Sequence, residues 1–288
     1  MSTAGVVGRG STYRLLGVTV DAMTMVDVYS SIEDAIRYQE RCVIGNHNLH
    51  SVYLYHRDAD MRRFYAAARY AFIDGMPIIL LGKLLRLPLG SEHRLTAADW
   101  FPPLMRHASQ RGWRVFLLGS RPGVPERAAE RLLHQSPGLQ LSTAHGYFDA
   151  TPGSSETEAI LQRIRNFQPH ILIVGMGMPR QERWICENLE HLEANVIMNQ
   201  GAVMDYVAGA VPTPPRWLGK LGLEWLARLV SEPGRLWRRY LLEPWYLLPA
   251  LLETLAARLS GRELLVDRSE ATRCSPENQK SPAPNSYP

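Results

Sequence analysis

The 288-residue sequence is poor in cysteine and lysine and contains no long apolar run. Its three cysteines, Cys42, Cys186 and Cys274, lie far apart and form no CxxC pair, which argues against a disulfide framework or a zinc site and fits a reducing compartment. No stretch of about 18 apolar residues free of charge occurs, and the N-terminus lacks a signal-like apolar segment. We therefore expect a chain that is soluble or lies on a membrane without crossing it.

Lysine is scarce even among the basic residues, since only Lys83, Lys220 and Lys280 accompany the arginines in a total of 32. Planar guanidinium groups suit phosphate and carboxylate, so anionic ligands are plausible. The 28 acidic residues leave a formal charge of +4, too small to indicate nucleic-acid binding without a local patch. A composition with 45% hydrophobic and 21% charged residues excludes a disordered or collagen-like chain.

Short apolar runs alternate with helical patterns through most of the chain. The strand-like runs are residues 15–20, 42–44, 71–73, 115–118, 139–143, 170–174 and 196–199. The helical patterns are residues 30–39, 58–69, 124–135, 156–167 and 181–192. This alternation predicts an α/β fold with a Rossmann-like, largely parallel sheet covered by helices on both faces.

The character of the sequence changes after Gly209, where prolines interrupt the chain and helical segments rich in Leu, Trp and Arg follow. We predict a Rossmann-like domain over residues 13–209 and a helical appendage over residues 210–266. Residues 1–12 and 267–288 carry little that could be buried, and we expect both to be disordered.

The appendage is basic and aromatic, with six cations, three acids and four tryptophans between residues 214 and 245. Side chains with apolar bodies and polar tips favour a membrane interface, and arginines suit anionic headgroups. Alternatively, the aromatic residues pack the appendage onto the domain and the arginines form its solvated face.

Two segments lead from an apolar strand through glycines into a helix start. One contains Gly119 and Arg121, and the other contains Gly175 and Gly177 before Gln181. Unpaired N–H groups at a helix start favour anions, so these loops could bind a pyrophosphate. Neither segment is a GxGxxG fingerprint or a P-loop, which argues against nicotinamide binding and ATP hydrolysis. The glycines could also serve only the packing of strand on helix.

Polar residues follow two other strands, at the edge where α/β sheets place ligands. Asn48 and His50 belong to one such cluster. Asp74 ends another strand and could act as a general base, or it could belong to a common Asp-Gly turn. Arg94 and Asp99 could form an ion pair bordering the same cleft or could cap a helix.

The order of these motifs resembles the WecG/TagA/CpsF family of bacterial glycosyltransferases over roughly residues 13–245. Nine elements carry the likeness: Asn48 and residues 74–75, 94–99, 116–119, 146–148, 175–182, 205–209, 216–225 and 228–239. The resemblance implies transfer of a hexose from a UDP-sugar, with inversion and without a required metal or cofactor. The acceptor it implies is a sugar on a polyprenyl diphosphate at the cytoplasmic membrane face, where members build teichoic-acid linkage units, enterobacterial common antigen and exopolysaccharides.

The resemblance also implies roles for particular residues. Asp74 falls on the family's presumed base, and Asn48 matches its Thr-x-Asn motif, in which Asn46 replaces the threonine. Gln181 and Glu182 match an element near the donor. The cations that match the family's membrane-docking segment, as candidates for membrane or lipid-diphosphate contact, are Arg216, Arg228, Arg235 and Arg238.

We therefore expect three groups of residues in a metal-free cleft. The catalytic group is Asp74, Asn48 and Asn46. The donor-binding group is Gly119, Arg121, Gly175, Gly177, Gln181 and Glu182. The acceptor group is His50, Arg94 and Asp99. Since no DxD-like acidic pair is near the loops, helix N-termini and arginines would neutralise the departing β-phosphate.

His50 and Ser51 resemble the exopolysaccharide branch, which adds glucose to a lipid-linked glucose. Two other functions stay open from the residues. One is a UDP-sugar transferase with a soluble acceptor, whose C-terminal helices form an oligomer interface. The other is a non-enzymatic regulator that binds a nucleotide sugar and contacts a partner protein or nucleic acid through its basic helices.

Overall fold

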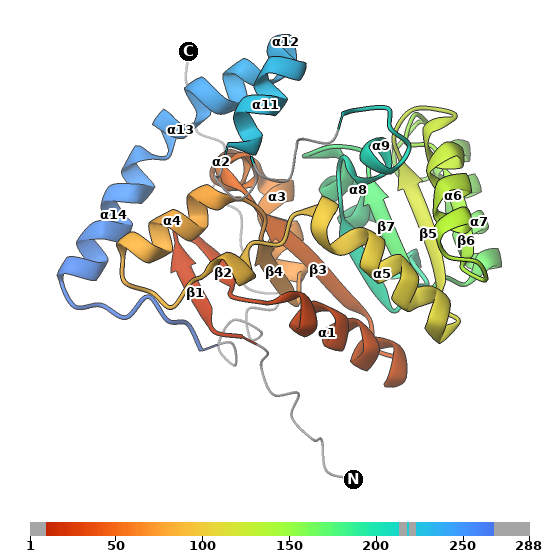
Figure 1. Cartoon of the computed structure of the whole chain (residues 1–288), viewed down its shortest axis with the longest axis horizontal. Helices are drawn as coiled ribbons and strands as arrows, with labels where there is room; N and C mark the ends of the chain where they lie inside the picture. Colours follow the sequence, from red (N-terminus) through yellow and green to blue (C-terminus); the bar gives the residue numbers. More distant parts are fainter. Residues whose placement is uncertain (1–9, 213–217, 219–222, 268–288) are drawn as a thin grey trace.

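A computed structural model describes residues 10–212, 218 and 223–267, which form one eight-stranded sheet with helices on both faces (Figure 1). In spatial order the strands are β1 (Thr12–Leu15), β2 (Val18–Asp21), β4 (Tyr70–Ile73), β3 (Cys42–His47), β8 (Val196–Asn199), β7 (Ile171–Gly175), β5 (Arg114–Gly119) and β6 (Gln140–Ala144). Every neighbouring pair is parallel except β1 and β2. The predicted α/β fold with a Rossmann-like, largely parallel sheet is confirmed.

The sheet has two halves that come from different parts of the chain. The N-terminal half contains β1 to β4, and the C-terminal half contains β5 to β8. The halves meet where β3 pairs with β8, with Cys42 opposite Val196. The chain leaves β3 for β4 on one side of this seam, whereas it reaches β8 from β7 on the other side. Such a switch point opens a crevice at the carboxyl ends of the strands.

Apolar side chains of the central strands alternate between two cores. Val115 and Leu117 belong to one core, whereas Phe116 and Leu118 belong to the other. The first core is covered by α1 (Met25–Arg37), α5 (Ala97–Arg111), α6 (Val124–Gln135) and α9 (Val203–Val207). The second is covered by α3 (Ala59–Ala67), α7 (Ser155–Phe167) and α8 (Arg180–Asn188), which continues into η2 (Leu189–His191). Parallel strands buried on both sides require this arrangement.

A third core at the N-terminal edge of the sheet fastens the C-terminal helices to the rest of the molecule. It joins β1 and β2 to three helices, α2 (Leu49–Arg57), α4 (Met76–Leu84) and α14 (Leu248–Leu259). The N–H of Leu16 donates to Oγ1 of Thr254 in α14 at 3.0 Å. After α14 the chain runs beside β1, where the Arg14 N–H donates to the Leu264 carbonyl at 2.8 Å.

Shorter helices complete the described chain. They are η1 (Ser91–His93), α11 (Glu224–Ser231), α12 (Pro233–Trp237), the π-helical η3 (Arg238–Leu242) and α13 (Glu243–Tyr246).

Several local features differ from the sequence-based expectation, and among them are the helices α4 and α5, which the sequence pattern did not indicate. The run at residues 15–20 is a hairpin of β1 and β2, because Leu16 and Gly17 turn the chain with φ values of 52° and 76°. The polar segment after β3 continues into α2, a helix that the periodicity does not indicate. Most of the ends predicted to be disordered lie outside the described residues, and the division after residue 209 stays a prediction.

Candidate functional site

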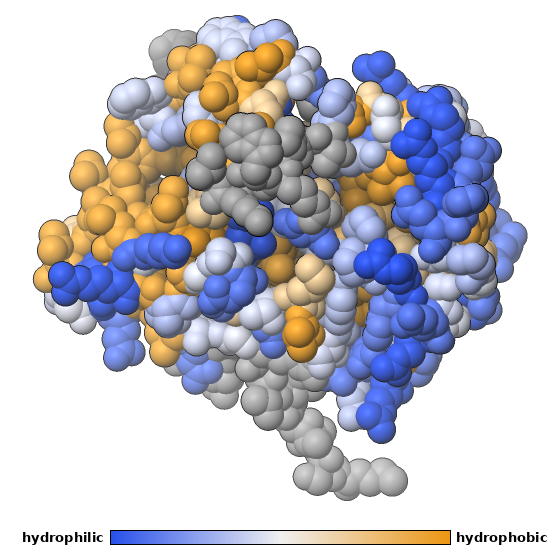
Figure 2. All heavy atoms as spheres, in the orientation of Figure 1, coloured by the Kyte–Doolittle hydropathy of each residue, from blue (hydrophilic) through white to orange (hydrophobic). Residues whose placement is uncertain are grey.

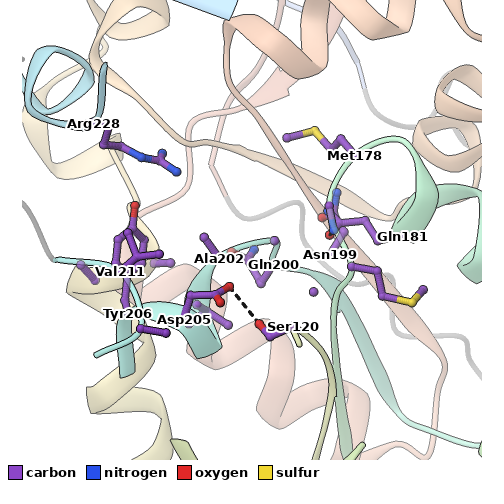
Figure 3. A pocket seen from close by; sticks show the side chains of 18 of the residues that line it. Ser120, Met178, Gln181, Asn199, Gln200, Ala202, Asp205, Tyr206, Val211 and Arg228 are labelled. Atoms are coloured by element: carbon purple, nitrogen blue, oxygen red, sulfur yellow. Dashed lines mark hydrogen bonds between the residues drawn. The ribbon is translucent and has the colours of Figure 1, made fainter. Parts of the chain in front are cut away.

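A cavity of about 990 Å³ lies at the carboxyl ends of β3, β4, β5, β7 and β8, at the seam between the two halves. Residues of α11 and η3 also line it, so the C-terminal helices cover one side. Figure 3 shows Arg228 and Tyr206 on one side, with Gln181 and Asn199 across from them. The volume and the position are those of a small-molecule site in an α/β fold.

The loops after β5 and β7, residues 119–121 and 175–178, build one side of the cavity, which we call the glycine wall. A Cβ atom at Gly119 would collide with the carbonyl group of Gly175. Gly119 therefore lets the two loops approach each other but does not itself line the cavity. Arg121 does line it and is exposed. This wall offers backbone groups and one guanidinium group, a combination suited to phosphate oxygens.

A buried amide network lies behind the glycine wall. Oε1 of Glu182 accepts hydrogen bonds from Nε2 of Gln181 at 2.8 Å and from Nδ2 of Asn199 at 2.7 Å. With its nitrogen held in this way, Gln181 presents Oε1 to the N–H of Gly177 at 3.0 Å. Glu182 is completely buried, does not line the cavity, and has a pKa raised by burial. Glu182 therefore affects the cavity only through the side-chain amides of Gln181 and Asn199, which line it.

Asn46 belongs to the same network. Its Nδ2 donates to the backbone carbonyl of Asn199 at 2.8 Å, which ties β3 to β8 at the seam. Its own carbonyl accepts the hydroxyl of Tyr65 at 2.6 Å. Asn46 lines the cavity but is buried, and its amide group holds the two halves of the sheet together at the seam.

The opposite side of the cavity is charged, and we call it the charged wall. It consists of Asp74, Arg94, Glu224, Arg228 and Arg239. Asp74 follows β4 directly and accepts a hydrogen bond from Nδ2 of Asn48 at 3.4 Å. Oδ1 of Asn48 in turn accepts from Arg239 at 3.3 Å. Burial raises the pKa of Asp74, while Arg228, Asn48 and Arg239 act in the opposite direction.

Arg228 is the cation of the charged wall that acts most strongly on Asp74. Burial opposes its charge, yet Tyr206, Tyr240 and Asp74 together raise the pKa of Arg228. Its guanidinium group lies 5.7 Å from the ring centre of Tyr206 (Figure 3). By contrast, burial and the nearby Arg228 lower the pKa of Arg239. Arg228 and Arg239 therefore act on Asp74 in a cavity that Glu224 and Glu232 also line. Guanidinium groups in this position can bind an added anion.

Arg94 and Asp99 form the ion pair that the sequence offered as one alternative, and neither residue is the N-cap of α5. Arg94 lies 3.4 Å from the Asp99 carboxylate and 3.1 Å from that of Glu224 in α11. Thr96 is the N-cap residue of α5, and its hydroxyl donates to Asp99 at 2.9 Å. Both charged residues line the cavity, and Arg94 additionally joins α11 to the segment after β4.

His50 lines the cavity and joins α2 to α13. Its Nδ1 lies 2.6 Å from Oε2 of Glu243. Arg57 strengthens the same junction, because its guanidinium carbon lies 4.9 Å and 4.4 Å from the ring centres of Tyr53 and Tyr246. The C-terminal helices are thus held over the cavity by polar and cation–π contacts.

The structure brings together most of the residues expected in the site. Those that line the cavity are Asn46, Asn48, His50, Asp74, Arg94, Asp99, Arg121, Gly175, Gly177, Gln181 and Arg228. Arg238 does not line it, and neither do Gly119 and Glu182. Arg216 and the side chain of Arg235 lie outside the described residues.

Sequence reasoning missed several lining residues. Asp205 accepts the hydroxyl of Ser120 at 2.9 Å and so joins α9 to the loop after β5 (Figure 3). Arg239 and Glu224 enter the charged wall from the C-terminal helices. Asp205 and Glu224 belong to the motif order that carries the family resemblance, which was the available signal. Arg239 shares its arginine-rich segment with Arg228, but only the fold brings both to Asp74.

Two features are absent from the part of the chain that the structure describes. No group of three or more His, Cys, Asp or Glu side chains there could hold a metal ion. None of the helices described is both long enough and apolar enough to cross a bilayer.

Comparison with known proteins was made independently of this geometry. The sequence model of the glycosyl transferase WecG/TagA/CpsF family matches residues 13–261. The N-acetylglucosaminyldiphosphoundecaprenol N-acetyl-beta-D-mannosaminyltransferases of Staphylococcus aureus strains MW2 and COL are each 28% identical to this chain over 234 residues. The matched region covers 78% of this chain and 86% of each relative.

Proposed function

This chain belongs to the WecG/TagA/CpsF family of glycosyl transferases, and we propose that it transfers a hexose from a UDP-sugar to a sugar carried on a polyprenyl diphosphate. The hexose is of the glucose or N-acetylmannosamine type, and the product serves exopolysaccharide or another bacterial surface glycan. The named activity of the Staphylococcus aureus relatives supports the lipid-linked acceptor. The observation that carries the proposal is the position of Asp74, which lies beside two arginines on one side of a cavity whose other side carries a glycine-rich loop.

In the proposed reaction, a hydroxyl oxygen of the acceptor sugar attacks the anomeric carbon of the donor. The bond from that carbon to the β-phosphate oxygen breaks, and UDP leaves with the bonding electrons. Attack from the face opposite the leaving group inverts the anomeric configuration. Asp74 accepts the hydroxyl proton, which is the role of a general base. A raised pKa suits this role, because it makes the carboxylate a stronger base.

Charge on the departing UDP is neutralised by arginine in this proposal. Arg228 and Arg239 lie beside Asp74, and their fixed positive charges can stabilise negative charge as it develops on the β-phosphate. The N–H groups of Ser120 and Gly177 already donate to Gly175 and Gln181, so the diphosphate is bound from the other side by Arg121 and by the remaining backbone N–H groups of the glycine wall. Transfer therefore proceeds without a metal ion.

Asn48 and Glu182 act as positioning residues. Asn48 caps α2 by accepting the Ser51 N–H at 3.1 Å, so its side chain is fixed when it donates to Asp74. Glu182 fixes Gln181 against the glycine wall. The donor contact expected for Glu182 thus becomes an indirect one.

The protein works on the inner face of the cell membrane in this proposal. The lipid tail of the acceptor stays in the bilayer, so the cavity must come to the membrane. Trp237 and Trp245 are exposed on the C-terminal helices at 41% and 67%. Tryptophan favours the headgroup region, and arginines of the same helices suit anionic lipid.

A donor and acceptor screen tests the proposal. The full chain is incubated with UDP-glucose, UDP-N-acetylmannosamine and related donors, together with short-chain prenyl-diphosphate sugars and free sugars. We expect a disaccharide on the prenyl diphosphate, with UDP released in equal amount, detected by mass spectrometry; its linkage and anomeric configuration are read by NMR. Transfer to free sugars alone would instead indicate a soluble acceptor. Donor binding without UDP release would indicate a regulator.

A further inference from the structure

Exposed large apolar side chains are concentrated on one part of the molecule. In α4, Leu80 is 55% exposed and Leu84 is 72% exposed. One turn apart, they lie on the same side of the helix. Apart from α4 and residues 224–265, the described chain exposes only four large apolar side chains, Val26, Tyr38, Leu133 and Tyr147. The leucines of α4 are therefore unusual among the described residues before residue 213.

The exposed side of α4 continues onto α14. Leu248, Leu252 and Leu259 of α14 are 42%, 64% and 88% exposed. The two helices share the third core, and Nε of Arg258 in α14 donates to the carbonyl of Leu85 at 3.0 Å. Figure 1 shows α4 and α14 beside each other, and Figure 2 shows apolar residues gathered over that side. We call Leu80, Leu84, Leu248, Leu252 and Leu259 the leucine face.

The surroundings of the leucine face are cationic and aromatic. Exposed cations on α4, on α14 and just after them are Lys83, Arg86, Arg258 and Arg262. They exceed the exposed acids of α14 and the turn after it, Glu253 and Glu263. Trp245 and Tyr246 of α13, just before α14, are 67% and 58% exposed. An apolar strip with cations and aromatic rings at its edge complements an anionic lipid surface.

We propose that the leucine face enters the headgroup and acyl boundary of an anionic bilayer, so that α4, which directly follows β4 and Asp74, contacts lipid together with α14. At 12 residues α14 is too short to cross a bilayer and suits a position in the plane of the interface. The inference deepens the proposed function, because contact through α4 fixes the orientation of the sheet, and with it the cavity, relative to the membrane.

Vesicle binding tests this contact without any substrate. The full chain and its Leu80→Glu/Leu84→Glu variant are sedimented with vesicles of equimolar phosphatidylcholine and phosphatidylglycerol. The variant loses the apolar burial of two leucines in the bilayer, and we expect its vesicle binding to be weaker by at least about tenfold. Leu133→Glu is the matched control, because Leu133 is exposed at 42% on α6, outside the leucine face. Truncation after Gly209 would be a poor test, because it would uncover the core that Leu247 and Ala250 help to form.

The outcomes separate this inference from the proposed function. Transfer to a water-soluble short-chain acceptor stays unchanged in Leu80→Glu/Leu84→Glu, because both side chains are exposed and neither lines the cavity. Vesicle binding equal to that of Leu133→Glu overturns the inference and leaves the proposed transfer intact. Loss of vesicle binding only in Trp245→Ala overturns it too, since the contact is then confined to α13 and its neighbours. If the unaltered chain is a dimer, Leu80→Glu/Leu84→Glu is a monomer and vesicle binding is unchanged, then the leucine face contacts a second copy of the chain. That result also overturns the inference.

Discussion

The two walls of the cavity are made by different parts of the chain. Both loops of the glycine wall follow strands of the C-terminal half of the sheet, and their geometry comes from backbone packing at Gly119 and Gly175. The charged wall combines Asp74 and Arg94 with Arg228 and Arg239, which lie more than a hundred residues later in the sequence. The glycine wall therefore needs only the sheet, whereas the charged wall is complete only when the C-terminal helices are docked.

We therefore expect the glycine wall to determine donor binding and the charged wall to determine the rate of the chemical step. A wall of backbone groups binds a diphosphate without titrating, so donor binding should depend little on pH. A wall of opposed charges sets the basicity of Asp74 and should control the chemical step. Substitutions in each wall can test whether binding and chemistry separate in this way.

The largest effect is expected from Asp74→Asn. The amide cannot accept the hydroxyl proton, so we expect kcat to fall by about a thousandfold. UDP affinity, measured by calorimetry, should stay within about twofold because the glycine wall is intact. Asp60→Asn, which removes a surface ion pair with Arg183 on α8, is the control and should leave kcat unchanged. Normal turnover by Asp74→Asn would refute the base assignment.

Arg228→Gln should lower kcat by about a hundredfold, because it removes a positive charge from the developing phosphate. It should also change the pH profile. Arg228 counteracts the burial that raises the pKa of Asp74, so its removal raises that pKa further. The base must be ionised, and the acidic limb of kcat/KM therefore moves to higher pH.

The control for Arg228→Gln is Arg106→Gln on α5, an exposed arginine outside the cavity. It should leave both kcat and the acidic limb unchanged. An unaltered limb in Arg228→Gln would mean that this arginine does not act on Asp74.

A smaller effect is expected from Glu182→Ala, which tests the network behind the glycine wall. The change leaves the amide nitrogens of Gln181 and Asn199 without their acceptor. We expect the donor KM to rise about tenfold with little change in kcat, and the free energy of unfolding to fall by about 2 kcal/mol. Glu182→Gln keeps an accepting oxygen and should restore the donor KM. No rescue by Gln would show that the charge itself is needed.

Glu182 should also make the free energy of unfolding depend on pH. Its folded-state pKa is raised by burial, so the folded protein holds the proton more tightly than the unfolded chain. Its contribution to stability is complete below the ordinary glutamate pKa and is lost as pH rises through the raised value. Glu182→Gln should therefore lose less unfolding free energy than wild type when pH rises from acidic to neutral, as chemical denaturation can measure.

Much of the sheet could be predicted because its periodicity is local. The helical pattern at residues 124–135 coincides with α6, and the strand pattern at residues 196–199 coincides with β8. The β1–β2 hairpin was missed because its turn, Leu16 and Gly17, interrupts an apolar run without a polar turn residue. The helix α2 was missed because its polar and aromatic residues give a weak amphipathic pattern.

The position of a site residue could be predicted from the sequence where that residue directly follows a strand. Asp74 and Asn48 both lie directly after strands, so topology brings them to the same edge. Arg239 and Glu224 could not be assigned in this way, because their positions depend on how the C-terminal helices dock on α2 and β1. The burial of Glu182 was also hidden, since its neighbour Gln181 lines the cavity and the sequence does not say which of the two does.

The smallest effect is expected from Gly177→Ala, which tests the glycine wall alone. Gly177 has a φ of 83°, and a Cβ there would meet nothing within 4 Å, so the cost is backbone strain of about 1 kcal/mol. Gly153→Ala is a close match, with a φ of 75° and the same open space, but it lies outside the cavity. The two variants should therefore lose similar unfolding free energy in denaturant titrations.

Donor KM is the readout that distinguishes these two glycines. The N–H of Gly177 is held by Gln181, and a shift of this peptide moves the loop that faces the diphosphate. We therefore expect the donor KM to rise about threefold, which corresponds to less than 1 kcal/mol, in Gly177→Ala and to stay unchanged in Gly153→Ala. Equal donor KM values in the two variants would mean that strain at Gly177 does not reach the bound donor. The separation of binding from chemistry would then rest on the charged wall alone.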